Sequence, residues 1–308
     1  MKILITGASG LIGGRLAEYL NKKKLNVVLA SRNKKKFKKY KYKKINWKSY
    51  KSLKKLCKNI DVIINCAGYD SHKCKNRSEA ITVNSKQPSR LFEVANNTGV
   101  SLFIYLSSAH IYKNNLVGNI NEKTKIKTSH IHGLSKQDGE NKLKKIENGN
   151  TKLLILRPSN LFGYPVNKKI KCWHLLINSL VKDLSLNGKA KILSKKNVYR
   201  NYSSLESFCN FIFFIFKNYI FKKKPLPKII NYCSEHNLNL INLVNIIKKR
   251  FAYLNKNKKI KINYKNNILL KSKKLLYKSI YAKKLNFSKD KNFIKEIDNL
   301  ILYCRTNF

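Results

Sequence analysis

The stretch TGASGLIG, residues 6–13, decides the fold that we expect for this chain. It directly follows KILIT (2–6), an apolar run that is typical of a buried β-strand, and it opens a helical pattern near 11–22. A strand, a glycine-rich turn and a helix in this order form the first half of a βαβ unit. The stretch therefore predicts an α/β domain.

The three glycines of this stretch predict a binding site for a dinucleotide. Gly7 permits a tight turn, Gly10 lets the backbone approach a pyrophosphate, and Gly13 allows the helix to pack closely. The N-terminus of the helix adds N–H donors and a positive dipole, which favour phosphate. The residues expected to contact the cofactor here are Gly7, Ser9, Gly10, Leu11, Ile12 and Gly13.

The end of the second expected strand, NVVLAS (26–31), bears on the choice of cofactor. No Asp or Glu is there to accept a hydrogen bond from a ribose 2′-hydroxyl. Ser31 and Arg32 can instead hold a 2′-phosphate. The sequence therefore favours NADP, with NAD as the alternative.

The first half of the chain alternates apolar runs with helical patterns, which is typical of a doubly wound parallel sheet of the Rossmann kind. The expected strands lie at 2–6, 26–31, 61–67, 101–108 and 152–158, and the expected helices near 11–22, 48–58, 77–98 and 132–147. We expect a smaller, interleaved C-terminal lobe for the substrate. The predicted domains are 1–166 for NAD(P) and 167–308 for the substrate, with 198–235 returning to the sheet.

Composition narrows the class of protein. The net charge is +51, but lysine is spread along the whole chain and outnumbers arginine several-fold. A/T-rich codons explain that pattern better than a nucleic-acid surface does, so we expect no nucleic-acid partner. Seven cysteines without a CxxC pair predict no disulfide framework and no metal site, and they fit a reducing cytoplasm. The longest apolar run, 208–216, is too short for a transmembrane segment, and we expect no signal peptide before the first strand.

Four further motifs follow the glycine stretch in order along the chain. They are Asn65-Cys66-Ala67-Gly68, Ser107 to Tyr112 (SSAHIY), HGLSK at 132–136 and RPSNLFG at 157–163. Together with GxxGxxG they resemble the extended short-chain dehydrogenase/reductase superfamily, the NAD-dependent epimerase/dehydratase family. The resemblance runs from residue 1 to about 250. It implies cofactor contacts at Cys66, Ala67, Gly68 and, near the adenine, Asn46.

The resemblance also implies a catalytic set with one departure. In that family a YxxxK motif supplies a proton-transferring tyrosine and a lysine that binds the nicotinamide ribose. Lys136 matches the lysine, Ser108 matches the catalytic hydroxyl that also contacts substrate, and His132 occupies the tyrosine position. We expect Lys136 to lower the pKa of His132, which suits a base. Tyr112 and His130 are alternative proton carriers.

On the substrate side, Asn160 and Arg200 match family residues that bind the diphosphate of a nucleotide-sugar. Ala109-His110 stands where the family's dehydratases carry an Asp-Glu pair, which argues against a 4,6-dehydratase. The resemblance therefore implies an epimerase or a keto-reductase of a nucleotide-activated sugar. The alternative is a degenerate member that binds NAD(P) or RNA as a regulator. Family members often dimerise through helices, here those expected at 77–98 and 132–147.

Overall fold

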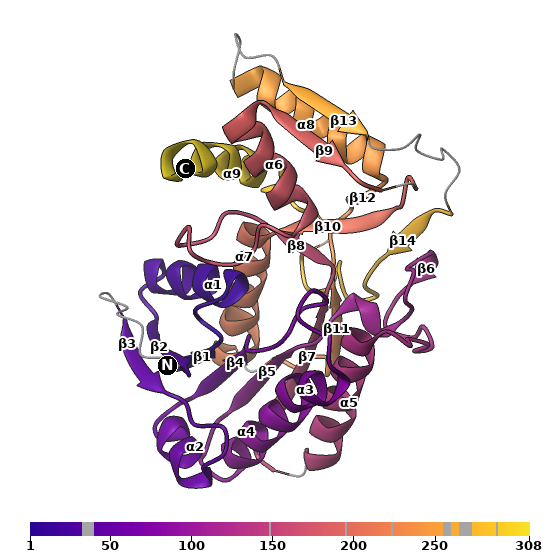
Figure 1. Cartoon of the computed structure of the whole chain (residues 1–308). Helices are drawn as coiled ribbons and strands as arrows, with labels where there is room; N and C mark the ends of the chain where they lie inside the picture. The colour runs from indigo at the N-terminus through magenta and orange to yellow at the C-terminus, as the bar shows by residue number, and fades with distance from the viewer. Residues whose placement is uncertain are drawn as a thin grey trace. The chain divides into compact units, whose positions relative to one another are not determined.

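The computed structural model describes residues 1–32, 40–147, 149–194, 196–222, 224–254, 260–264, 273–287 and 289–308 (Figure 1). The chain forms two compact units, and it passes between them several times. The first unit contains Met1–Asn115, Thr124–Pro158 and Phe213–Asn231, and the second contains Leu116–Lys123, Ser159–Ile212 and Tyr232–Phe308. Which unit binds which ligand stays a prediction.

Seven of the described strands form one central sheet, in the order β11-β7-β5-β4-β1-β2-β3. They are β1 (Lys2–Thr6), β2 (Asn26–Ser31), β3 (Lys41–Lys44), β4 (Val62–Asn65), β5 (Leu102–Leu106), β7 (Lys152–Pro158) and β11 (Ile229–Tyr232). The pairs from β7 to β3 are all parallel. The predicted doubly wound parallel sheet is therefore confirmed.

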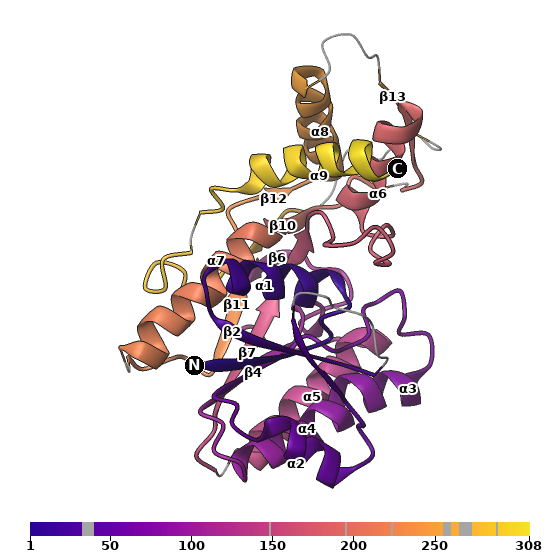
Figure 2. The same cartoon turned by 90° about the vertical axis from the view of Figure 1, so that its left-hand side faces the viewer.

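Helices cover both faces of this sheet (Figure 2). They are α1 (Leu11–Lys22), α2 (Tyr50–Cys57), α3 (Arg77–Ile81), the π-helical η1 (Thr82–Lys86), α4 (Gln87–Asn96), the 3₁₀ turn η2 (Ala109–Ile111) and α5 (Ile131–Ile146). Helix α1 lies on one face, and α2, α4 and α5 lie on the other. The ring of Phe213, from α7 (Leu205–Ile215), lies 6.4 Å from that of Tyr19 and so contacts α1.

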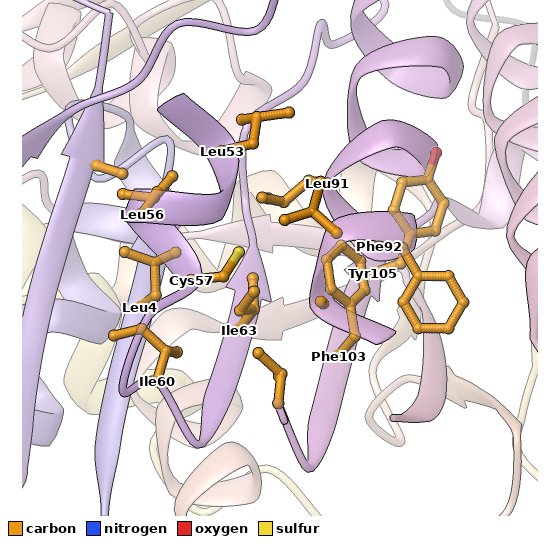
Figure 3. Packing of buried hydrophobic residues seen from close by; sticks show 14 of the residues in the cluster. Leu4, Leu53, Leu56, Cys57, Ile60, Ile63, Leu91, Phe92, Phe103 and Tyr105 are labelled. Carbon is orange, nitrogen blue, oxygen red and sulfur yellow. The ribbon is translucent and has the colours of Figure 1, made fainter. Parts of the chain in front are cut away.

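The core beneath α2 and α4 shows why the apolar stretches of the chain form the central sheet (Figure 3). Leu4, Ile63 and Phe103 point from the strands towards Leu53 and Phe92 on the helices, and all five are fully buried. The rings of Phe92 and Phe103 lie 5.1 Å apart. Burying each such side chain contributes ~1.5–3 kcal/mol, so these contacts hold the helices on the sheet.

Strand β3 was not predicted from the sequence. Its residues, KYKK, contain no apolar run, and its side chains are exposed or half-buried. It pairs with β2 as the outermost strand, where lysine is common because it discourages further pairing. The Tyr42 hydroxyl donates a hydrogen bond to the Ser31 carbonyl at 2.9 Å and fastens this edge.

The second unit has smaller sheets and its own core. Its strands are β6 (Gly118–Ile120), β8 (Asn160–Phe162), β9 (Lys189–Ile192), β10 (Arg200–Ser204), β12 (Asn237–Leu238), β13 (Lys261–Tyr264) and β14 (Leu275–Tyr277). Helices α6 (Leu176–Asn187), α8 (Leu240–Leu254) and α9 (Phe293–Asn307) pack around that core. Helix α6 is capped at its C-terminus by Gly188, whose left-handed backbone (φ +63°) suits glycine.

None of the helices in the described part of the chain combines the length and apolar character of a membrane span.

Candidate active site

The glycine loop joins β1 to α1 at the carboxyl edge of the sheet. Gly7 has φ +67°, and a Cβ there would lie 2.6 Å from the Ala67 nitrogen. A Cβ on Gly13 would lie 2.6 Å from the Gly7 carbonyl oxygen. Both positions therefore require glycine for the backbone to close. Because Gly13 has no side chain, the first turn of α1 lies directly against the backbone of the glycine loop.

Gly10 is less crowded than Gly7 and Gly13. It is the N-cap residue of α1, and no side chain caps this helix end. A Cβ on Gly10 would meet only the Gly7 carbonyl oxygen, at 3.3 Å. Ser9, Leu11 and Ile12 complete the loop and first turn, whose N–H groups have no partners within a helix. The loop thus offers donors and open space for an anionic ligand.

The loop after β4 lies directly against the glycine loop. The Thr6 hydroxyl donates to the Asn65 side chain at 2.8 Å and accepts from the Ala67 N–H at 3.2 Å. These bonds tie together the carboxyl ends of β1 and β4. Burial raises the pKa of the Cys66 thiol to about 12, so Cys66 is a neutral packing group and not a nucleophile.

Lys136 reaches from α5 to this second loop. Its Nζ donates to the Leu106 carbonyl at 2.8 Å and would lie 3.0 Å from a Cβ on Gly68. Burial lowers the pKa of Lys136 to about 8, against the opposing effect of nearby thiols, Cys74 first. The side chain still carries its proton at neutral pH. The structure therefore brings Lys136 and Gly68 together.

His132 lies one turn before Lys136 on the same helix. It is 7% exposed, and its Nδ1 is buried with no hydrogen-bond partner among the described residues. Burial, followed by the charge of Lys136, lowers the pKa of His132 to about 3. The predicted direction is confirmed, but the main cause is burial rather than Lys136. At neutral pH the imidazole is uncharged and can accept a proton.

The turn that carries Ser108 packs against the start of α5. The Ser108 hydroxyl accepts a hydrogen bond from the His110 N–H at 3.2 Å and begins η2. A Cβ on Gly133 would lie 2.5 Å from the His110 carbonyl oxygen. The His110 and His132 rings lie 6.1 Å apart, edge to face. Glycine at 133 therefore lets η2 approach His132 closely.

The two alternative proton carriers have other partners. The buried Tyr112 hydroxyl donates to the Asn231 Oδ1 at 2.8 Å and accepts from the Arg157 guanidinium at 2.7 Å. His130 is the N-cap of α5, and its Nδ1 accepts from the His132 N–H at 3.2 Å. Tyr112 thus holds two other side chains in place, and His130 caps the backbone at the start of α5.

Asn84, in η1, was not predicted from the sequence as a site residue. Its side chain connects the loop after β4 to the first turns of α5. Its side chain accepts from the Tyr69 N–H at 2.7 Å and donates to the Ser135 hydroxyl at 3.0 Å. Its carbonyl accepts from the Tyr105 hydroxyl at 2.5 Å. Pro88 is the sequence feature that indicates the last contact. Proline has no N–H, so Pro88 cannot donate to the Asn84 carbonyl four residues before it, and the carbonyl can accept from another donor.

Arg32 and Asn46 follow β2 and β3, and both are exposed. Because these strands are parallel to β1, their carboxyl ends share the edge that carries the glycine loop. The Asn46 Oδ1 accepts a hydrogen bond from the Lys48 N–H at 3.1 Å. Both positions are open to a ligand along this edge.

Asn160 and Arg200 lie on paired strands, β8 and β10, within the second unit. Asn160 pairs with Tyr202 in the β8–β10 ladder, and its side chain donates to the Asn201 carbonyl at 2.9 Å. Arg200 begins β10 and is exposed. The Asn201 side chain points inward and donates to the Ser234 carbonyl at 2.8 Å. The structure therefore places Asn160 and Arg200 on two paired strands, and the inward hydrogen bonds of Asn201 make it structural.

A doubly wound parallel sheet, a glycine loop at its carboxyl edge and a buried lysine at the next loop define a Rossmann-type protein. The chain belongs to the NAD dependent epimerase/dehydratase family, whose sequence profile matches residues 3–231. No curated protein matches the chain by sequence.

Solved structures share the fold over the whole length. UDP-glucose 4-epimerase from Thermotoga maritima with UDP-glucose is 16% identical, with 99% of each chain covered and a TM-score of 0.81. UDP-glucuronic acid 4-epimerase from Bacillus cereus in complex with NAD is 17% identical, with a TM-score of 0.79 over 100% of this chain and 97% of that chain. An NAD-dependent NDP-hexosamine 5,6-dehydratase of tunicamycin biosynthesis is 14% identical, with a TM-score of 0.78 over 100% and 99%.

Proposed function

We propose that this protein is an NAD(P)-dependent enzyme that epimerises a nucleotide-activated sugar or reduces its keto form. The observation that carries the proposal is the buried pair on α5. Lys136 lies against Gly68, and His132 presents an uncharged imidazole one turn earlier. Hydride transfer at a sugar carbon requires such a base for the hydroxyl proton. The fold shared with UDP-sugar epimerases supports the substrate class.

The residues present fit an NAD(P) molecule. The open space at Gly10 and the uncapped N-terminus of α1 suit a pyrophosphate. Lys136 would bind the nicotinamide ribose beside Gly68, and Asn46 would bind the adenine. When bound, the nicotinamide supplies the hydride chemistry.

The side chains of the first unit would handle the proton. His132 accepts it from a sugar hydroxyl, and Ser108 orients that hydroxyl. Burial, followed by the charge of the Lys136 ammonium, keeps the imidazole uncharged between turnovers. Ala109-His110 offers no carboxylate pair, so we do not propose 4,6-dehydration.

On the substrate side, we propose that Asn160 and Arg200 bind the diphosphate of the nucleotide-sugar. A guanidinium matches the geometry of phosphate oxygens, and an exposed Arg200 is available for it. The test of the whole proposal is a thermal-shift panel of NAD, NADP, UDP-glucose and UDP-N-acetylglucosamine. It is followed by a chromatographic assay for sugar conversion. Stabilisation by the cofactors without any converted sugar would favour a regulatory protein instead.

Replacing Gly10 with valine is expected to raise the Kd for NAD(P) by ~10-fold or more, which is ~1.4 kcal/mol of binding energy. The valine side chain occupies the space that we assign to the pyrophosphate. The fold should survive because a Cβ at Gly10 meets only the Gly7 carbonyl oxygen, at 3.3 Å, and a shift of a few tenths of an ångström relieves that contact. Calorimetry measures the Kd, and circular dichroism checks the fold. Gly13→Ala is the contrasting variant, since its Cβ would clash with Gly7 and lower the melting temperature as well. Unchanged affinity in folded Gly10→Val would rule out this site.

Replacing Arg32 with aspartate is expected to reverse the cofactor preference from NADP to NAD. Aspartate can accept a hydrogen bond from a ribose 2′-hydroxyl, whereas it repels a 2′-phosphate. Loss of the phosphate contact should cost ~1.5–3 kcal/mol in NADP affinity. The measurement is the ratio of the two dissociation constants, with Arg90→Asp as a surface control. Tighter binding of NAD by the wild type would show the NADP assignment to be wrong.

A further inference from the structure

Tyr105, on β5, is a fully buried tyrosine whose hydroxyl and ring have different partners (Figure 3). The hydroxyl donates a hydrogen bond to the Asn84 carbonyl on η1 at 2.5 Å. The Lys136 ammonium lies over the face of the ring, with its Nζ 5.1 Å from the ring centre. Tyr105 therefore connects η1 to the lysine that we assign to the nicotinamide ribose.

Gly139 allows α5 to pack directly against the Tyr105 hydroxyl. A Cβ at Gly139 would lie 2.5 Å from the Tyr105 Oη and 2.6 Å from the Asn84 carbonyl oxygen. Because Gly139 follows Lys136 by three residues, both lie on the face of α5 that meets Tyr105. The hydrogen bond and the close helix backbone thus fix the orientation of the ring beneath Lys136.

The ring supplies an attraction that the buried ammonium needs. An ammonium has three N–H donors, and the Leu106 carbonyl, at 2.8 Å, is the one hydrogen-bond acceptor of Lys136 among the residues that the structure describes. The face of an aromatic ring is the negative part of its quadrupole, and it attracts a cation most strongly where water is excluded. Burial raises the pKa of Tyr105 well above its usual value, so the phenol itself stays neutral.

We propose that Tyr105 is a positioning residue for Lys136, whose ring keeps the ammonium charged and on the side of the Gly68 loop. This inference rests on the proposed function, in which Lys136 binds the cofactor ribose beside Gly68. The Leu106 carbonyl and the ring hold the ammonium, and a Cβ on Gly68 would lie 3.0 Å from its Nζ. Tyr105 makes no contact with the ribose in this arrangement and acts only through Lys136.

Other titratable groups also act on this part of the site. They are the Cys74 and Cys66 thiols, Glu140 and Asp70, which act on Lys136, and His132, which is itself acted on by Lys136. Burial lowers the pKa of Lys136 to about 8, and the first four groups oppose that effect, Cys74 first. A substitution at position 105 leaves all of these groups in place. A changed pKa of Lys136 in such a variant therefore reports on the ring.

The first test changes the electrostatics of the ring and keeps its shape. Tyr105→Phe and Tyr105→pentafluorophenylalanine have rings of similar size, but the fluorines withdraw electrons and reverse the quadrupole. We expect Tyr105→Phe to keep the pKa of Lys136 near the wild-type value of about 8. The fluorinated ring should lower it by about 1, because it no longer stabilises the ammonium. NMR titration of the lysine side chain, assigned with Lys136→Arg, measures both values.

Phe103→pentafluorophenylalanine is the matched control. Phe103 lies on the same strand, is equally buried and packs against Phe92, with the two ring centres 5.1 Å apart. Fluorination there should leave the pKa of Lys136 unchanged. Equal pKa values of Lys136 in the two Tyr105 variants, or an equal shift in the Phe103 control, would overturn the proposal.

The second test connects the ring to cofactor binding. At pH 6 the ammonium is charged over either ring, whereas at pH 8 the fluorinated ring leaves most of it neutral. The Kd for NAD(P), measured by calorimetry, should therefore be ~5-fold higher in Tyr105→pentafluorophenylalanine than in Tyr105→Phe at pH 8, and nearly equal at pH 6. A packing defect would raise Kd equally at both pH values, and that result would overturn the positioning role. If the wild type binds no NAD(P), the proposed function fails, and the NMR titration alone decides whether the ring holds Lys136.

Discussion

Replacing Glu140 with glutamine is expected to lower the free energy of unfolding by ~3–5 kcal/mol, the cost of removing one partner from a buried ion pair. Glu140 is fully buried and accepts hydrogen bonds from Arg157 at 2.9 and 2.6 Å and from the Ser107 hydroxyl at 2.5 Å. Burial disfavours the charged Arg157, but the hydrogen bonds and charge of Glu140 raise its pKa above the usual value. The variant would therefore keep a buried guanidinium without its counter-charge.

Asp138→Asn is the matched control, because Asp138 forms an ion pair with Lys142 on the same helix at 2.8 Å. Both side chains are 38% exposed, so this pair should contribute no more than ~0.5 kcal/mol. Urea unfolding followed by circular dichroism gives both values. The double variant Glu140→Leu/Arg157→Met should recover most of the loss, because an apolar pair leaves no buried charge. Equal losses for Glu140→Gln and Asp138→Asn would show that the buried pair contributes little.

The main strands could be predicted because they are continuous apolar runs. Strands β1, β2 and β7 have the predicted limits, 2–6, 26–31 and 152–158. Strand β3 could not be predicted, since its lysine-rich residues gain their structure only by pairing with β2. The same holds for β12, whose two residues gain strand geometry only by pairing with β10. A sequence pattern shows burial more readily than it shows backbone pairing.

The candidate active site, too, could be predicted from the sequence only in part. The spacing of His132 and Lys136 predicts that both lie on one face of a helix. It does not predict that burial is the main cause of the lowered pKa of His132. Burial of a polar side chain depends on what packs over it, which the helical period does not show. The Glu140–Arg157 pair and the Asn84 contacts also join residues far apart in the chain. No short sequence pattern indicates such contacts, apart from Pro88 for the Asn84 carbonyl.

Replacing His132 with alanine is expected to lower turnover by ~10²–10⁴-fold, the usual contribution of a general acid–base group. The affinity for NAD(P) should change little, because Lys136 and the glycine loop remain. Steady-state kinetics and calorimetry measure the two effects. His174→Ala, an exposed histidine of the second unit, is the control and should behave like the wild type.

The same variant should change how stability depends on pH. His132 has a pKa of about 3 in the folded protein and 6.5 as an ordinary histidine, so between these values only the unfolded chain binds the proton. Stability therefore falls as the pH falls through this window, by up to ~1.4 kcal/mol per pH unit. Alanine cannot titrate, and His132→Ala should show a shallower loss between pH 6.5 and 4. Equal slopes would mean that His132 takes up its proton without unfolding.

His132→Tyr separates an altered enzyme from a degenerate one. Tyrosine restores the residue that the family's YxxxK motif carries, beside a Lys136 that is already in place. If the imidazole carries the proton, both His132→Ala and His132→Tyr should fall below the wild type, since the site is built around the shorter ring. Activity that appears only in His132→Tyr would instead identify the natural protein as a binding member of the family. Wild-type rates in both variants would assign proton transfer to another group.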